Sequence, residues 1–103
     1  MPRIIVLFKL KDGTDRDAYE DWARNSDVPT VTNLPSVDGF TVHRATGLLG
    51  SDAPSPYQYV EVLDVSSMDG LFADISTEAM QAIAAQFQSF ADNPQFIVTE
   101  DLG

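Results

Sequence analysis

His43 is the single histidine of the sequence and the side chain best suited to proton transfer at neutral pH. If the loop that follows its strand centres near Asp52, residues whose numbers sum to about 104 lie opposite each other, so His43 pairs with Glu61. A carboxylate neighbour would hold the imidazole in one tautomer and suit it to acid–base work. Two interpretations remain open: His43 is a general base or acid oriented by Glu61, or the two form a structural pair at a sheet face.

A second candidate for proton transfer is Asp27, which precedes Val28 and Pro29. Pro29 must disturb a helix here because it has no N–H and clashes with the preceding turn. A bend re-aims nearby side chains, and Asp27 would then be the second proton-transfer group or would hold a substrate N–H. The alternative is that Asp27 caps the short helical segment after Pro29.

Aromatic side chains are numerous enough to line a pocket for a flat substrate, although the same residues could form ordinary core. Tyr59 is the best candidate because it shares a strand face with Glu61. The other candidate lining residues are Tyr19, Trp22, Tyr57 and Phe40, of which Trp22 and Phe40 fit the core better. Phe72, Phe87 and Phe90 are expected in the core.

Metal and cofactor sites have little support in the sequence. There is no cysteine, and one histidine among scattered carboxylates lacks the close ligand spacing of a metal site. No glycine-rich loop is spaced to hold phosphates. We therefore expect no metal and no cofactor.

The amino-acid composition excludes some classes of binding partner. The 103 residues carry a net charge of −10, which argues against nucleic acid and anionic membrane surfaces as partners. With 44% hydrophobic residues the chain can build one core, so we expect a single domain over residues 1–103. The longest apolar run spans residues 4–8, far too short for a signal peptide or a membrane span, which predicts a cytoplasmic protein.

The elements that must position these residues follow from periodicity and turn signals. Strands are predicted over residues 3–11, 40–48, 57–65 and 95–102, and helices from residue 14 to 34, disturbed at Pro29, and over residues 68–90, with a break at Ser76 and Thr77. The order β-α-β-β-α-β predicts an α+β ferredoxin-like sandwich with a four-stranded antiparallel sheet, in which the first and third strands are expected to lie parallel at the centre. The first strand is apolar on both faces, which predicts that a second copy covers the open sheet face in a homodimer.

The element order and length resemble the dimeric α+β barrel superfamily over the whole chain. The stretch from Tyr19-Glu20-Asp21-Trp22 to Asp27-Val28-Pro29 is similar to the EthD-type signature, with aspartate in place of its histidine. That replacement, with residues 57–62 (YQYVEV), resembles the RedY-like (HapK-type) branch. The resemblance puts Asp27 at a ligand-facing position. Because aspartate replaces the histidine, EthD-like or haem-type chemistry is not carried over.

The RedY-like resemblance implies a small cofactor-free protein of bacterial pathways to prodigiosin-type and bisindole products, acting on reactive heteroaromatic intermediates. The leading hypothesis is a cofactor-independent enzyme that catalyses cyclisation, condensation or rearrangement of a small indole- or pyrrole-type substrate by acid–base chemistry. The predicted catalytic residues are His43, Asp27 and Glu61, and Tyr59, Tyr19 and Trp22 are predicted to bind substrate. The alternatives are a cofactor-free monooxygenase of the antibiotic-biosynthesis type and a non-catalytic carrier of an unstable intermediate.

Overall fold

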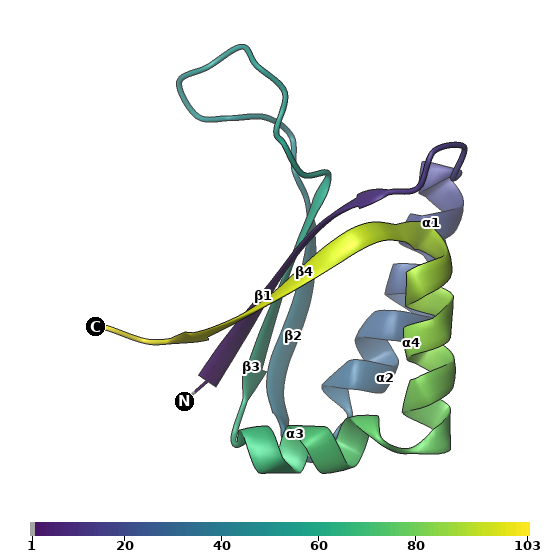
Figure 1. Cartoon of the computed structure of the whole chain (residues 1–103), viewed down its shortest axis with the longest axis vertical. Helices are drawn as coiled ribbons and strands as arrows, with labels where there is room; N and C mark the ends of the chain where they lie inside the picture. Colours follow the sequence, from purple (N-terminus) through teal and green to yellow (C-terminus); the bar gives the residue numbers. More distant parts are fainter. Residues whose placement is uncertain (1) are drawn as a thin grey trace.

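The computed structural model describes residues 2–103 and contains one four-stranded sheet with helices packed against it (Figure 1). The elements in chain order are β1 (Pro2–Leu10), α1 (Arg16–Trp22), a π-helical turn η1 (Ala23–Asp27), α2 (Val28–Thr32), β2 (Val37–Arg44), β3 (Tyr59–Val65), α3 (Met68–Ile75), α4 (Glu78–Phe90) and β4 (Ala91–Glu100). This order confirms the predicted ferredoxin-like α+β fold.

The sheet has the strand order β2-β3-β1-β4, and each neighbouring pair is antiparallel. The expectation of a parallel pair at the centre was wrong. The crossover through α1 gives β1 and β2 the same direction, but β3 lies between them and runs back from β2. β3 is therefore antiparallel to both strands beside it.

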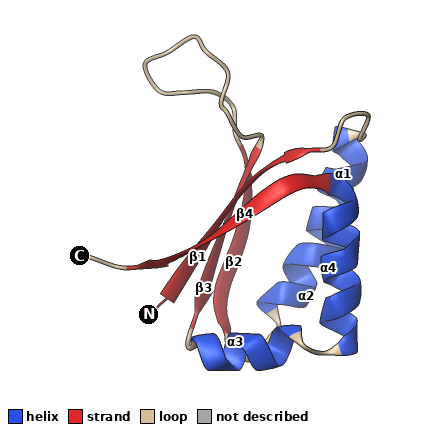
Figure 2. Cartoon of the chain, viewed as in Figure 1, coloured by secondary structure: helices blue, strands red, loops and turns tan. Residues whose placement is uncertain are grey.

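Helices α1, α2 and α4 lie on one face of the sheet, and α3 crosses one end of it (Figure 2). The β1 side chains that point to the helices are Ile4, Val6 and Phe8, and all three are buried. Tyr19 and Phe87 of the helices pack edge-on against the Phe8 ring, with centroids 5.7 and 5.0 Å away. The core therefore fills the space between the sheet and the helical layer.

The opposite sheet face stays without a cover within residues 2–103. It presents apolar side chains from three strands: Ile5, Leu7, Val60, Val62 and Ile97. Ile97 keeps 42% of its surface exposed. Across the described chain, no helix combines the length and apolar character that a membrane span requires.

The predicted break in the second long helix is confirmed. α3 ends at Ile75, and α4 begins after Thr77, whose hydroxyl accepts the backbone N–H of Met80 at 3.3 Å. The break turns the first segment away from the line of the second, so Phe72 is 58% exposed and its predicted place in the core was wrong. Phe87 is buried and Phe90 packs against the core, as predicted.

Strands β2 and β4 begin three and four residues earlier than predicted, because each contains an irregular residue near its start. β2 starts at Val37, and the register shift between Val37 and Gly39 makes room for Asp38, a residue type that is common in turns. β4 starts at Ala91 and contains Pro94, next to Asn93 with a φ of 47°. A bulge on an edge strand accommodates a proline because the N–H that it lacks is not needed there.

Candidate active site

The first helix positions Asp27 by widening its turn. Buried residues recur there at steps of four: Tyr19, Ala23, Asp27 and Val31. In a regular α-helix each such step rotates the side chain by about 40°, so the four would drift off one face. The π-helical turn is wider, with Val28 N–H bonded to the Ala23 carbonyl, and it returns Asp27 to the face that meets the sheet.

The predicted disturbance at Pro29 is therefore confirmed, and it takes the form of this wider turn immediately before the proline. The alternative role of Asp27 as a helix cap was wrong. Its backbone is helical (φ −67°, ψ −57°) and its side chain makes no capping hydrogen bond. Its carboxyl is instead directed inward, and only 4% of the residue is exposed.

Glu61 reaches the same buried space from the sheet. It lies on β3 between Val6 of β1 and Val42 of β2, on the helix-facing side, and is 5% exposed. Burial, and next the nearby charge of Asp27, raises the pKa of Glu61 to about 8. Burial raises the pKa of Asp27 to about 6. Of the two carboxyls, Glu61 therefore holds its proton more strongly and Asp27 ionises more readily.

Tyr19 stands beside this carboxyl pair. Burial, and then the charges of Glu61 and Asp27, raises the pKa of its hydroxyl far above the usual value. Tyr19 Oη is near enough to Glu61 to influence it, but the two complete no hydrogen bond. Both Tyr19 Oη and Glu61 Oε2 are buried without a hydrogen-bond partner within residues 2–103. Unpartnered buried polar atoms are costly, and they are expected where a ligand or water completes the site.

A second glutamate, Glu20, lies in the opposite electrostatic environment. Arg44 donates to it through Nε (2.7 Å to Oε2) and Nη2 (2.5 Å to Oε1), the Tyr59 hydroxyl donates to Oε2 at 2.7 Å, and Arg24 donates to Oε1 at 3.3 Å. The hydrogen bonds from Arg44, followed by that from Tyr59, lower the pKa of Glu20 to about 2. Glu20 therefore stays ionised at neutral pH and organises its neighbours rather than carrying a proton.

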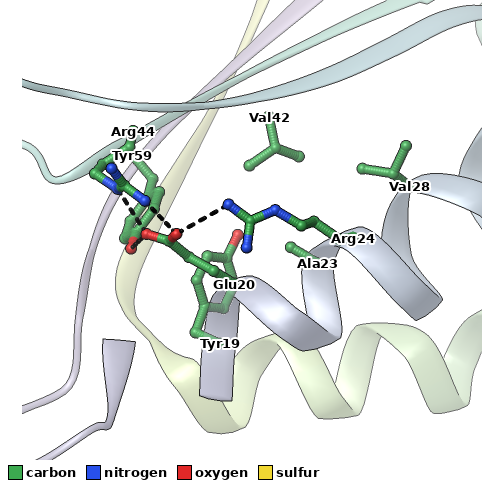
Figure 3. A pocket seen from close by; sticks show the side chains of 8 residues that line it. All are labelled: Tyr19, Glu20, Ala23, Arg24, Val28, Val42, Arg44 and Tyr59. Carbon is green, nitrogen blue, oxygen red and sulfur yellow. Dashed lines mark hydrogen bonds and ion pairs between the residues drawn. The ribbon is translucent and has the colours of Figure 1, made fainter. Parts of the chain in front are cut away.

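A pocket of about 310 Å³ opens between the first helical segment and strands β2 and β3 (Figure 3). Its lining residues are Tyr19, Glu20, Ala23, Arg24, Val28, Val42, Arg44 and Tyr59. The volume suits a small bicyclic molecule. Asp27 and Glu61 are not part of the wall, but they flank it: Asp27 adjoins Val28, and Glu61 pairs with Val42. Tyr19 belongs to both the wall and the buried pair's surroundings.

The predicted pairing of His43 with Glu61 was wrong by one residue. His43 lies opposite Val60, and Glu61 lies opposite Val42. The long connection of residues 45–58 is not symmetric about Asp52, and a shift of one residue moves a side chain to the other sheet face. His43 is thus exposed on the face away from the helices, where Nε2 lies 2.9 Å from Thr41 Oγ1. The structure does not bring it to the carboxyl pair.

Of the three aromatic residues predicted to bind substrate, two line the pocket and one does not. Tyr19 and Tyr59 line the pocket, and Tyr59 shares the face of Glu61, as predicted. Trp22 is outside the pocket wall; it packs against Phe90 with ring centroids 5.4 Å apart and donates to Gln86 Oε1 at 2.7 Å.

Sequence reasoning missed Glu20 and Arg24, because charged residues on a helix usually form a solvated face, and it missed Arg44 at the end of β2. The signal available was the spacing of Arg16, Glu20 and Arg24, which puts two arginines one turn either side of a glutamate. Within residues 2–103 there is no group of three or more side chains that could hold a metal ion.

Comparison with known proteins gives a family match over nearly the whole chain. The family model described as REDY-like protein HapK matches residues 2–102. The crystal structure of HapK from Hahella chejuensis is similar, with 36% identity, a TM-score of 0.81, and coverage of 100% of this chain and 94% of that one.

More distant likenesses concern the fold alone. An EthD family protein from Bacillus halodurans has 18% identity, a TM-score of 0.75 and 99% coverage of both chains. SnoaB from Streptomyces nogalater, a cofactor-independent oxygenase, has 11% identity and a TM-score of 0.73, with 99% of this chain and 93% of that chain covered. Among curated proteins none matches this chain.

Proposed function

This chain belongs to the REDY-like HapK family, and on that premise we propose that it is a cofactor-independent enzyme that moves protons on a small conjugated heteroaromatic molecule. Indole- and pyrrole-type intermediates of bacterial secondary metabolism are the proposed substrates, and cyclisation, condensation or rearrangement the proposed outcome. The pocket of about 310 Å³ and its two tyrosines support a flat aromatic ligand of this size.

The observation that carries this proposal is the buried pair of carboxyl groups with separated pKa values. Ionised Asp27 takes up the proton that a C–H or N–H of the substrate loses, and neutral Glu61 supplies the proton that another ring atom gains, with Tyr19 between the pocket and the pair. The substrate gains and loses one proton, so no oxidant, reductant or cofactor is required. Passage of a proton from Asp27 back to Glu61 restores the starting state.

Tyr19 is the proposed link between the pocket and the pair. It lines the pocket, and Figure 3 shows its hydroxyl directed among the pocket side chains rather than back along its own helix. Its hydroxyl has no hydrogen-bond partner within the described chain. A hydroxyl that both donates and accepts can carry a proton between a bound ring and Glu61.

We also propose that the protein works as a homodimer. The sheet face away from the helices carries apolar side chains on adjacent strands, among them Leu7, Val60 and Ile97. A contiguous apolar face of this kind is stabilised by a matching face, and a second copy related by a two-fold axis provides one. Sedimentation equilibrium at micromolar concentration tests this: a monomer of 11.3 kDa would contradict it.

The catalytic proposal is tested by exchange of ring protons for deuterium. Indole, 2-methylindole and pyrrole are incubated with the protein in D₂O at neutral pH, and loss of each ring proton signal is followed by NMR. We expect exchange faster than in buffer, reduced about 10²–10⁴-fold by Asp27→Asn and by Glu61→Gln. The matched controls are Asp52→Asn and Glu100→Gln, which change exposed carboxylates.

Three outcomes would contradict the proposal. An exchange rate unaffected by Glu61→Gln would show that Glu61 is not the proton donor. Oxygen consumption with these compounds would favour the monooxygenase alternative. An equal loss on His43→Gln with a folded dimer would show that the chemistry lies on the other sheet face.

A further inference from the structure

Three arginines converge on one carboxylate in this acidic chain. Arg44 and Arg24 donate to Glu20, and Arg16 Nε lies 3.9 Å from Glu20 Oε2. These are half of the six basic residues in a protein of net charge −10. One carboxylate cannot neutralise three guanidinium groups, so the cluster keeps an excess of two positive charges.

The cluster belongs to the pocket wall. Arg24 and Arg44 line the pocket, and Figure 3 shows the Arg24 guanidinium extending across it towards Glu20. Arg44 and Tyr59 also line an adjoining hollow of about 230 Å³, where Arg16 contributes the second cation. The excess charge therefore lies where a ligand would enter.

Donors remain available in this cluster. A guanidinium carries five N–H donors, and Arg24 uses one of them, on Glu20, at a long 3.3 Å. Arg44 uses Nε and Nη2 on the same carboxylate and keeps its Nη1 donors. Within residues 2–103 the hydrogen bonds and ion pairs of both side chains are directed at Glu20, and Tyr59 adds a weaker influence on Arg44. Half-exposed ion pairs add little to stability, so fold stability alone does not account for the third arginine.

We propose that the substrate carries a carboxylate or similar anionic group, bound between Arg24 and Arg44 at the pocket mouth, with its aromatic ring directed towards Tyr19. This inference rests on the proposed function and names the charge of its substrate. Glu20 fixes the Arg44 fork in place, and Arg16 adds attraction from the adjoining hollow. The anionic end is thereby held away from Asp27 and Glu61, with which it would otherwise compete for protons.

The test compares two probes of nearly the same shape. Indole-3-acetate carries the charge and indole-3-acetamide does not; acetate serves as a carboxylate without a ring. Affinities are measured by calorimetry, and the arginine Nε–H signals are followed by ¹⁵N NMR. We expect indole-3-acetate to bind at least about tenfold more tightly than the amide, as one added charge-assisted hydrogen bond provides, and the preference to weaken with salt.

Variants locate the effect. Arg24→Gln is expected to bring the acid-to-amide ratio close to one, and Arg24→Lys to restore part of it. The control is Arg3→Gln, an arginine of β1 that pairs with Asp64 on the other sheet face. Arg24 has an exposed side chain, so the variant should fold, and the comparison of acid with amide on the unaltered protein needs no variant.

The possible results separate the two proposals. Equal binding of acid and amide would overturn the anion site and leave the aromatic pocket standing. Shifts of the Arg24 and Arg44 signals by acetate, with no binding of either indole, would support the anion site and contradict the heteroaromatic substrate. No shift of these signals by any of the three probes would overturn the anion site.

Discussion

Replacing Glu61 with glutamine should make the protein more stable at alkaline pH and leave it nearly unchanged in acid. Glutamine imitates the neutral form that the buried site favours, and it cannot ionise. Since the pKa of Glu61 is raised in the folded state, its protonated form stabilises the fold fully below the unfolded pKa of 4.5, and that contribution disappears as the pH rises through about 8.

The magnitude follows from the shift. From 4.5 to about 8, at 1.36 kcal/mol per pH unit, wild-type protein loses up to about 5 kcal/mol of unfolding free energy through this one group, and about 4 kcal/mol of it by pH 8. The residue is 5% exposed, so solvent screening takes little from this figure. A small domain has only about 5–15 kcal/mol in all, so the effect is large.

The assay is urea unfolding followed by fluorescence of Trp22, the single tryptophan, at pH 4, 6 and 8 and one fixed protein concentration. The free energies of unfolding of Glu61→Gln and wild type should differ by no more than about 1 kcal/mol at pH 4. At pH 8 the variant should be more stable by about 4 kcal/mol. Glu100→Gln, on the exposed part of β4, should show no such trend. A difference that does not change with pH would refute the assignment of Glu61 as a buried acid.

Three further outcomes follow from the same contacts. Asp27→Asn removes the charge that raises the pKa of Glu61, so that pKa should fall, as ¹³C NMR of the Glu61 carboxyl would show; an unchanged value would mean that the two do not interact. Tyr59→Phe deletes the 2.7 Å hydrogen bond to Glu20 and keeps the ring, so urea unfolding at pH 7 should show a loss of about 1–3 kcal/mol. Glu20→Gln should lower the free energy of unfolding at pH 7 by a similar amount, again about 1–3 kcal/mol, because the carboxylate that Arg44 and Tyr59 bind is lost. That deficit should shrink between pH 4.5 and about 2, where wild-type Glu20 itself becomes protonated, and a deficit that persisted there would contradict the ion-pair explanation.

The fold was largely predictable because the helix and turn signals of single residues agree with the β-α-β-β-α-β order of the whole chain. Thr77 and Pro29 each mark a helix irregularity that their chemistry requires, and the structure has both. The strand ends were less predictable, since Asp38 and Pro94 are turn formers that a bulge accommodates inside a strand. Bulges depend on the partner strand, which single-sequence patterns do not reveal.

The site was predictable only in its residue types. Asp27 and Glu61 were identified, but the partner chosen for Glu61 was on the wrong face. Counting from the centre of a long loop leaves an error of one residue, and in a strand one residue is the difference between the two faces. The placement of Tyr59 and Glu61 on one face was more secure, because the alternation of side chains along a single strand does not depend on the register of its partner.

The two glutamates of this site show what the fold adds to composition. Glu20 and Glu61 start from the same ordinary pKa, yet arginines and a tyrosine hydroxyl hold the first near 2, while burial and Asp27 hold the second near 8. An acidic chain with few basic residues can produce this separation only by gathering its cations around one carboxylate and keeping them from the other. The arginines therefore lie in the pocket wall and the carboxyl pair lies beside it, an arrangement that would orient an anionic aromatic molecule before any proton moves. The two ends of the site are therefore separable: loss of the arginines should weaken binding of the anionic end and leave the pKa of Glu61, which burial and Asp27 raise, largely unchanged.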